Sequence, residues 1–460
     1  MTEEETPLPL SVKLGWGVGE LAIAFYVGVT MAFFLFYLTD ALAVSPVLAG
    51  TALLIPRLWD AVTDPIMGAI SDRTRTRIGR RRPYLLVGSI CFGVSFYFVL
   101  TPPSFEDEWM KVLYFTVMYA LVSTAYTIYD VPYSSMAAEM CRSYRARTNL
   151  VGYKMIAARV GIIIAATISP LLFNSRETLQ EGFALLGLVG GVFIIVTGLI
   201  AFFATAHAPS TESVVTSFSL RDELSAVVRN RPFANLFAVF LLQNLAIGAS
   251  ATTLIYFLTI TMQLSSNLVG PLFAVTGVVA LLATPGWVVV GGRLGKKVAY
   301  SRGLLVSMLA AIAIFFLPPP LAMLLFGIYV ISGIADAGTQ FMPNAMVPDT
   351  VEVDELRTGV RREGTVFGAW AFCRKTGMAG GAFLASIVLS LFGFTSGGAE
   401  QPASAEFGVR VAFSILPLVL WIGAWVKLRH YDLDEERFEQ IRLQLAETGA
   451  GAGAGTEGND

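Results

Sequence analysis

The sequence predicts an all-α membrane protein of twelve transmembrane helices, arranged as two pseudo-symmetric six-helix bundles. Of its 460 residues, 55% are hydrophobic and only 14% are charged, and the mean hydropathy is +0.65. A spanning helix needs about 20 mostly apolar residues. Twelve stretches meet this requirement, and they begin near Trp16, Pro46, Tyr84, Val112, Leu150, Gly182, Phe233, Asn267, Tyr300, Pro320, Thr365 and Val409.

Charge and cysteine content exclude several classes of protein. The formal net charge is -2, and the basic residues lie in short loops rather than on one soluble surface, which argues against nucleic-acid binding. Cys91, Cys141 and Cys373 lie in or beside apolar stretches, so they predict neither a disulfide framework nor a metal site. The start of the chain is acidic and no small-residue cleavage site follows the first apolar stretch, so we expect the first helix to be retained.

Lysine and arginine gather in alternate loops, at residues 73–82, 142–147, 293–302 and 357–362. The loop at residues 101–108, on the opposite side, is acidic. Because positively charged loops stay on the cytoplasmic side, we expect both termini to be cytoplasmic. The predicted location is the plasma membrane, which is the inner membrane if the source is a bacterium.

A long polar connector separates the two predicted bundles, and a weak repeat relates them. Gly291 to Lys297 follows the eighth stretch much as Gly79 to Arg81 follows the second, which is typical of transporters built from two halves. The expected divisions are a cytoplasmic N-terminus (1–14), an N-terminal bundle (15–205), a cytoplasmic central loop (206–232), a C-terminal bundle (233–430) and a partly disordered cytoplasmic tail (431–460).

Ionisable groups lie inside the second predicted helix. Asp60 and Asp64 are one helical turn apart on the same face, and Arg57 precedes them on that face. An ionised carboxylate at the bilayer centre costs at least about 2.5 kcal/mol. Two adjacent acids also repel, and a bound cation, a proton or a guanidinium relieves that repulsion. The pair is therefore a candidate cation site, and the alternative is a structural network of arginine and aspartate.

The first, fourth and fifth predicted helices add polar groups. Glu20 either lines a cavity or is a hydrated residue near the cytoplasmic end. Thr127 and Asp130 share one face of the fourth helix, so packing of that helix on the second would bring them to Asp60 and Asp64. Lys154 is a candidate partner for these acids, or a snorkelling side chain near a helix start.

The C-terminal half carries charges at the end of its fourth helix and inside its fifth. Mixed charges from Asp349 to Gly364 suit either a gate that forms and breaks ion pairs or a solvated loop helix. Lys375 lies in the eleventh predicted helix, where an ammonium needs a nearby carboxylate. We therefore expect Lys375 to lie within about 10 Å of Asp60, Asp64 or Asp130.

Four motifs together resemble the glycoside-pentoside-hexuronide:cation symporters, a family that includes the melibiose permease. They run from Arg57 to Gly68, Asp72 to Pro83, Asp130 to Ser134 and Asp349 to Gly364, and the resemblance covers about residues 11 to 430. The resemblance implies the major facilitator fold, transport by alternating access and no catalytic residues or cofactor beyond a coupling ion, Na+ or H+.

The resemblance also implies roles for individual residues. The cation would bind at Asp60, Asp64, Thr127 and Asp130, with Asp60 and Asp64 as the metal ligands if the ion is Na+. The substrate would contact Glu20, Asp130, Ser134, Gln340 and Lys375. Charge-network and gating roles would fall on Arg57, Asp72, Arg73, Asp349, Glu352, Glu355 and Arg361.

The chain departs from the melibiose permease at the sugar site. Ser134 stands where that protein has tryptophan, Met155 where it has arginine, and Gln340 where it has a further aromatic residue. An aromatic face for stacking on a pyranose ring is missing at these positions, which argues against galactosides but leaves cation coupling unaffected.

The leading hypothesis is therefore a cation-coupled symporter, a monomer in the bilayer, for a sugar or related polar solute. A second hypothesis is an amphipathic substrate such as a lysolipid, because lysolipid carriers resemble the same family. A third is a membrane enzyme or sensor without transport, which no metal-ligand spacing, nucleophile motif or phosphate loop supports.

Overall fold

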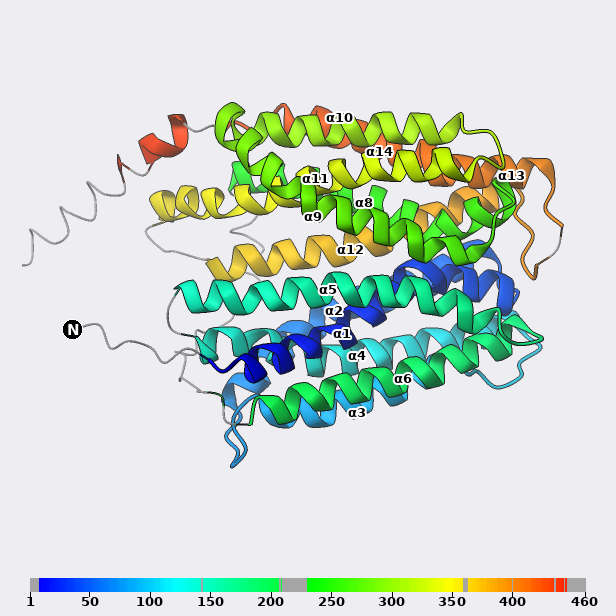
Figure 1. Ribbon diagram of the computed structural model, residues 1–460, viewed down its shortest axis with the longest axis horizontal. Coiled ribbons are helices and arrows are strands. Elements are labelled where there is room, and N and C mark those ends of the chain that lie inside the picture. The colour runs from blue at the N-terminus through cyan, green and yellow to red at the C-terminus, as the bar shows by residue number, and fades with distance from the viewer. Residues whose placement is uncertain are drawn as a thin grey trace, which may run out of the picture. The chain divides into compact units, whose positions relative to one another are not determined.

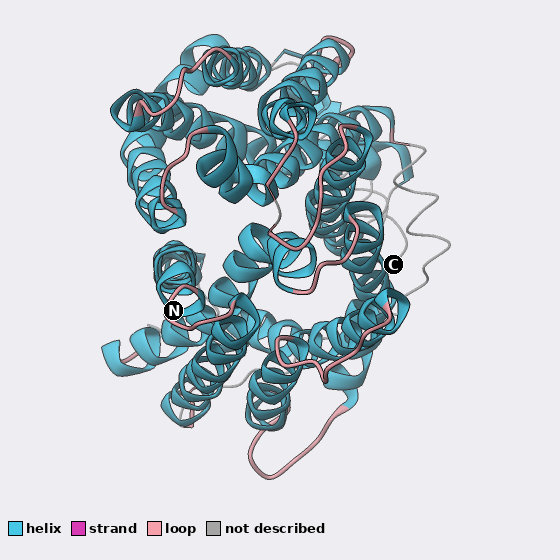
Figure 2. Ribbon diagram, turned by 90° about the vertical axis from the view of Figure 1, so that its right-hand side faces the viewer, coloured by secondary structure: helices cyan, strands magenta, loops and turns pink. Residues whose placement is uncertain are grey.

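The computed structural model describes residues 8–141, 144–206, 208, 230–358, 363–398, 400–433, 436–441 and 443–444. Helices connected by loops make up this described part of the chain, and it contains no strand (Figure 2). The chain divides into two compact units. Unit 1 comprises Met1–Phe218, Gly248–Ala274 and Ala379–Phe413, and unit 2 comprises Ser219–Ile247, Val275–Met378 and Ser414–Asp460.

The first six spans all lie in unit 1 (Figure 1). They are α1 (Leu10–Phe36, continued by the π-helix η1, Tyr37–Ala41), α2 (Pro46–Arg73), α3 (Arg82–Val99), α4 (Glu108–Met140), α5 (Tyr144–Phe173) and α6 (Leu179–Ala204). Helix α1 packs against α5 and α6, α3 packs against α4 and α6, and α2 packs against α4. The packing of the second span on the fourth, which the site requires, is thus present.

Six further spans follow the central loop. They are α8 (Arg231–Tyr256, continued by η2, Phe257–Thr261), η3 with α9 (Ser266–Leu268 and Val269–Leu294), α10 (Lys296–Phe315), α11 (Ala322–Thr358), α12 (Glu363–Leu391), and α13, η4 and α14 in one line (Ala403–Arg410, Val411–Ile415 and Leu416–Leu428). Counted over the described residues, these make twelve spans, as the sequence predicts.

Two of the twelve helices differ from the others in composition. Ten helices among the described residues are long and apolar enough to cross a membrane. The other two are α2, with 28 residues, and α12, with 29. They are long enough to span, but α2 carries Arg57, Asp60 and Asp64, and α12 carries Arg374 and Lys375. Their interior charges, placed where lipid-facing helices have none, indicate function rather than a different topology.

The ends of α1 and α8 have the same local structure, which shows that the two halves repeat. Each helix ends in a π-helical turn, η1 or η2, and a residue with positive φ follows: Ala43 (φ 54°) and Gln263 (φ 53°). In both cases the next amide closes the turn, with Val44 N donating to the Leu38 carbonyl at 2.8 Å and Leu264 N to the Leu258 carbonyl at 2.8 Å.

A second repeated feature follows the next helix in each half, α2 and α9. Gly79, after α2, and Gly295, after α9, both have left-handed backbones, with φ of 107° and 82°. Glycine adopts this conformation without the steric cost that a side chain would add. The weak repeat predicted from the sequence thus corresponds to a left-handed glycine after each helix, although eight residues separate α2 from α3 and only Gly295 separates α9 from α10.

Within unit 1, hydrogen bonds join the helix ends that lie away from the basic loops. The Thr39 hydroxyl lies 2.7 Å from the Tyr256 hydroxyl, and the Gly397 amide donates to the Thr39 carbonyl at 2.8 Å. The Ser396 hydroxyl donates to the Val44 carbonyl at 2.8 Å. These hydrogen bonds connect η1, the end of α8 and the loop after α12.

Unit 2 has its own apolar core, which includes part of the C-terminal tail. The rings of Phe240 and Trp370 stack with centroids 3.8 Å apart. Tyr431, Leu433 and Ile441 are buried in the same core cluster. The tail beyond residue 444 lies outside the described residues. The domain boundaries predicted from the sequence stay predictions, because most of the central loop also lies outside the described residues.

Candidate cation and substrate site

Helices α2 and α4 bring the predicted cation ligands together. The Thr127 hydroxyl donates to Asp64 Oδ1 at 2.7 Å. Asp60 and Thr127 are each only 1% exposed, whereas Asp64 is half-buried. Carboxylate and hydroxyl oxygens from facing helices thus lie close together, which is the donor chemistry that hard monovalent cations prefer. Among the described residues, no group of three or more His, Cys, Asp or Glu side chains gathers as a metal cluster.

Arg57 lies beside the first of these acids. Its Nη1 is 3.5 Å from Asp60 Oδ2, and its Nη2 donates to the Thr30 hydroxyl at 3.2 Å. The guanidinium also lies 5.5 Å from the ring centroids of both Tyr26 and Tyr119. Two aromatic faces and a carboxylate around one guanidinium make a buried cation tolerable. The predicted arginine–aspartate network therefore exists, alongside the Asp64–Thr127 pair.

Asp130 accepts two hydrogen bonds from its own helix. Tyr126 Oη donates to one carboxylate oxygen at 3.0 Å, and Ser134 Oγ donates to the other at 3.0 Å. Thr127 and Asp130 are one turn apart on α4, so the Asp64–Thr127 pair and the Asp130 cluster are adjacent. This adjacency gives α4 a direct means of linking a cation site to a substrate site.

Lys154 of α5 completes a polar chain on unit 1. Its Nζ donates to Ser134 Oγ at 2.8 Å and lies 3.4 Å from Glu20 Oε2. Lys154 Nζ also lies 5.1 Å from the centroid of the Tyr133 ring. Contacts therefore run from Glu20 through Lys154 and Ser134 to Asp130, which are groups able to accept from and donate to the hydroxyls of a polar solute.

Close packing of α1 on α4 positions Glu20. The Tyr133 hydroxyl donates to the Trp16 carbonyl at 2.8 Å, and the Tyr129 hydroxyl donates to the Gly19 carbonyl at 3.2 Å. A Cβ on Gly19 would lie 2.6 Å from the Tyr129 hydroxyl, so only glycine allows this approach. Glu20 is consequently buried between helices rather than a hydrated residue at a helix end.

Met155 stands at the position where the melibiose permease has arginine. It is 62% exposed, whereas the neighbouring Lys154 makes the polar contacts. The sequence contains a signal for the pairing of Lys154 with Glu20, because an acid inside a span requires a cation nearby. Sequence reasoning identified Lys154 as a candidate partner for the acids of the second and fourth spans but did not name Glu20 as its partner.

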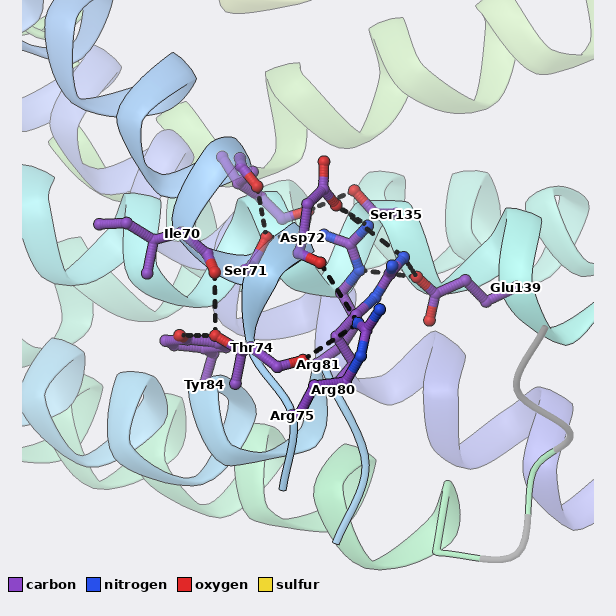
Figure 3. Close-up of polar contacts among 12 residues, drawn as sticks. Ile70, Ser71, Asp72, Thr74, Arg75, Arg80, Arg81, Tyr84, Ser135 and Glu139 are labelled. Carbon is purple, nitrogen blue, oxygen red and sulfur yellow. Dashed lines mark hydrogen bonds and ion pairs between the residues drawn. The ribbon is translucent and has the colours of Figure 1, made fainter. Parts of the chain in front are cut away.

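The loop after α2 forms a cluster of ion pairs with α4 (Figure 3). Arg81 Nη2 lies 2.6 Å from Asp72 Oδ1, its Nη1 donates to Ser71 Oγ at 2.7 Å, and its Nε donates to Glu139 Oε1 at 2.8 Å. Arg80 also pairs with Glu139. This cluster holds the end of α4 to the loop between α2 and α3.

Two details of that cluster differ from the residues named by sequence reasoning. The partners of Asp72 are Arg80 and Arg81, and no ion pair of Arg73 occurs among the described residues. Glu139 was not predicted, although two adjacent arginines at a helix start require a counter-charge. Its place at the end of α4 only becomes apparent once α4 packs beside α2.

In unit 2 a similar ion pair joins the start of α10 to α11. Lys296 Nζ lies 2.7 Å from Asp349 Oδ2 and donates to the Ala345 carbonyl at 3.0 Å. Arg357 pairs with Asp354 at 2.9 Å. Glu352 and Glu355 lie on the same helix end, half-buried, and Arg361 lies outside the described residues.

Gln340 and Lys375 also belong to unit 2. The Asn344 amide donates to the Gln340 carbonyl at 2.6 Å, and Trp370 Nε1 donates to Asn344 Oδ1 at 2.9 Å. Two hydrogen bonds through Asn344 therefore connect the Trp370 side chain to the backbone carbonyl of Gln340. Lys375 is half-buried on α12, and its predicted approach to the acids of unit 1 stays a prediction.

A family model described as MFS/sugar transport protein matches residues 15–435. The chain belongs to this family. Three similar proteins are the uncharacterized symporter YnaJ of Bacillus subtilis (28% identical, covering 97% of this chain and 96% of the relative), and, from Escherichia coli, the putative glycoside/cation symporter YagG (28%, 97% and 97%) and a glucuronide carrier protein homolog (29%, 94% and 94%). The resemblance to the glycoside-pentoside-hexuronide:cation symporters is thereby confirmed.

A more distant relative bears on the second hypothesis. The sodium-dependent lysophosphatidylcholine symporter 1 of Gallus gallus is 22% identical and covers 96% of this chain, with 90% of that protein covered. Among solved structures, a bacterial homolog of the human lysosomal transporter Spinster, inward-facing and unoccupied, matches with a TM-score of 0.67 at 16% identity, covering 95% of this chain and 97% of that one. The major facilitator fold is confirmed, and the MFS/sugar transport family comprises membrane transporters rather than enzymes.

Proposed function

We propose that this multi-pass membrane protein couples the movement of one Na+ or H+ to the symport of a sugar, glycoside or related polar solute by alternating access. The observation that carries the proposal is the set formed by buried Asp60 and Thr127 and half-buried Asp64, beside the Asp130 cluster. The names of the relatives, which include a glycoside/cation symporter, support it.

The charges of the α2 site favour a single monovalent cation. The formal charges of Arg57, Asp60 and Asp64 leave one net negative charge, which one Na+ or one proton neutralises. Thr127 adds a hydroxyl oxygen on the facing helix. Binding of the cation would draw α2 and α4 together at Asp64 and Thr127. The proposal requires no cofactor other than the coupling ion.

The polar chain on α1, α4 and α5 is the proposed substrate surface of unit 1. Glu20 and Asp130 can accept hydrogen bonds from solute hydroxyls, and Lys154 and Ser134 can donate to solute oxygens. Gln340 and Lys375 are the proposed contacts from unit 2. A row of charged and hydroxyl groups favours a polar solute over the acyl chain of a lysolipid, because an acyl chain would leave these groups without partners.

The basic loops support the proposed orientation. Arg80 and Arg81 lie in the loop after α2, and Lys296 and Lys297 begin α10 directly after Gly295. The positive-inside rule places basic residues at such span ends in the cytoplasm. We propose that both termini face the cytoplasm, that the protein lies in the inner membrane if its source is bacterial, and that it acts as a monomer.

Uptake by the purified protein in proteoliposomes tests this function. A panel of radiolabelled pentosides, hexuronides, glycosides and lysophosphatidylcholine would be offered under an imposed Na+ gradient, an imposed H+ gradient and neither. We expect gradient-driven accumulation of a polar glycoside-type solute with one of the two ions. Accumulation of the lysolipid alone would establish the second hypothesis, and facilitated equilibration indifferent to both gradients would overturn symport.

A further inference from the structure

A groove on unit 2 runs between α8 and α14, and none of its lining residues belongs to the site described above. Its volume is about 560 Å³, and its walls are Ala238, Leu241 and Leu242 of α8 and Gly423, Val426, Lys427 and His430 at and after α14. All of the lining side chains are apolar except Lys427 and His430, which lie at one end. The groove is thus short, open and apolar, and Lys427 and His430 border it.

Small residues create the groove. Gly423 has no side chain, and a Cβ at this position would lie 3.5 Å from Leu242 Cδ1, which is ordinary contact distance. A larger side chain at Gly423 would therefore extend into the space in front of Leu242. A hydrogen bond also connects the two sides of the groove, because the Asn235 side-chain amide of α8 donates to the backbone carbonyl of His430 at 3.1 Å.

The groove opens on a surface that suits hydrocarbon. Val419, Ile422 and Val426 are 58%, 43% and 45% exposed, and their spacing puts them on one face of α14. Exposed aliphatic side chains along one face of a spanning helix are typical of contact with lipid acyl chains.

The basic end of the groove lies at the expected depth of lipid headgroups. The apolar span that contains α14 ends at Leu428, so Lys427 and His430 flank the point where the hydrocarbon region ends. Trp425 lies close by, donating from Nε1 to Ser301 at 2.8 Å and stacking under the Arg429 guanidinium at 3.8 Å. Tryptophan and basic residues at this level are typical of the membrane interface.

The Lys427 ammonium and the His430 imidazole are available to an anion. No ion pair or side-chain hydrogen bond of Lys427 or His430 occurs among the described residues. The neighbouring Lys297 instead donates to the Arg429 and Tyr431 carbonyls, at 2.9 Å and 2.6 Å. The Lys427 ammonium therefore supplies a positive charge with which an anion at the membrane interface can pair.

We propose that this groove binds an anionic glycerophospholipid, with its phosphate on Lys427 and His430 and one acyl chain along the wall formed by Leu241, Leu242, Gly423 and Val426. Basic pockets between spanning helices on the cytoplasmic side recognise anionic headgroups in this way. The site is separate from the transport site, and it holds whether or not the proposed symport is correct.

Native mass spectrometry of the delipidated full-length protein, titrated with dioleoylphosphatidylglycerol or dioleoylphosphatidylcholine, tests the proposal. We expect one phosphatidylglycerol to bind more tightly than phosphatidylcholine. Lys427→Gln should weaken phosphatidylglycerol binding about 5-fold, which corresponds to about 1 kcal/mol for one interfacial cation. Gly423→Leu should weaken both lipids by filling the groove.

Two matched variants control for charge and for bulk. Arg293→Gln removes an exposed cation from the last turn of α9, and Gly286→Leu adds bulk at a glycine whose Cβ would meet nothing within 4 Å. Both should bind phosphatidylglycerol as the unmodified protein does. Equal loss with Arg293→Gln, or unchanged binding by both Lys427→Gln and Gly423→Leu, would overturn the proposal. Phosphatidylglycerol binding that appears only after deletion of residues 445–460 would assign the groove to the protein's own tail instead.

Discussion

The hydroxyl of Thr127 allows the candidate cation site to be tested with the smallest change. Thr127→Val keeps the shape of a side chain that is 1% exposed and removes the donor that lies 2.7 Å from Asp64. A hydrogen bond to a charged group contributes about 1.5–3 kcal/mol. If Na+ is the coupling ion, the hydroxyl is also lost as a ligand, so the Na+ concentration for half-maximal uptake should rise roughly 10- to 100-fold.

The assay is the Na+ dependence of solute uptake into proteoliposomes, with Thr124→Val as the matched control. Thr124 lies nearly one turn earlier on α4, and its hydroxyl accepts from Trp59 Nε1 of α2 at 3.0 Å. Thr124 therefore also joins α2 to α4 by a hydrogen bond, but its partner is Trp59 and not a carboxylate of the candidate cation site. Thr127→Ser should restore the normal Na+ dependence. The reasoning is refuted if Thr127→Val leaves that dependence unchanged, or if Thr124→Val shifts it equally.

Three further outcomes are expected. Lys375→Ala should change the cation dependence of uptake while expression stays normal, because an ammonium near the acids competes with the coupling ion; an unchanged ion dependence would contradict this. Glu139→Gln should lower the thermal melting temperature, because it removes the counter-charge of two arginines with side chains 8% and 7% exposed, and breaking such a pair costs about 3–5 kcal/mol. A melting temperature within one degree or so of the unmodified protein would count against that role. Tyr256→Phe removes the hydrogen bond to Thr39, worth about 1 kcal/mol, so a cysteine at buried Val44 should react roughly 5-fold faster with a membrane-impermeant thiol reagent; an equal rate would show that this hydrogen bond does not hold the helix ends together.

The sequence was sufficient for the fold and for the α2–α4 pair. Spacing put Asp60 and Asp64 on one face of a helix, and the resemblance in the fourth span put Thr127 opposite them, where the structure has it. The reason is that charge inside an apolar span has few physically acceptable locations. A stricter hydropathy threshold leaves out α2 and α12, since only ten of the described helices meet it, whereas the requirement of about 20 mostly apolar residues includes both.

Contacts between distant segments could not be predicted in the same way. Lys154 binds Ser134 and lies beside Glu20 because α1, α4 and α5 converge, and Glu139 meets Arg81 because α4 returns to the loop after α2. Neither pairing has a sequence spacing that would identify it. The repeated turns at Ala43 and Gln263 were also missed, since two different residues in the left-handed region leave little sequence signal.

The most direct measurement of the central claim compares accumulation with exchange for Asp64→Asn in proteoliposomes. Accumulation against a gradient requires the coupling ion, whereas exchange of labelled for unlabelled solute requires only the substrate site and alternating access. We predict that Asp64→Asn abolishes accumulation driven by the imposed ion gradient and retains exchange, and that Asp60→Asn is less severe because Asp60 already has Arg57 beside it. Accumulation by a folded Asp64→Asn protein at the ratio of the unmodified protein would contradict the assignment of the cation site to α2 and α4.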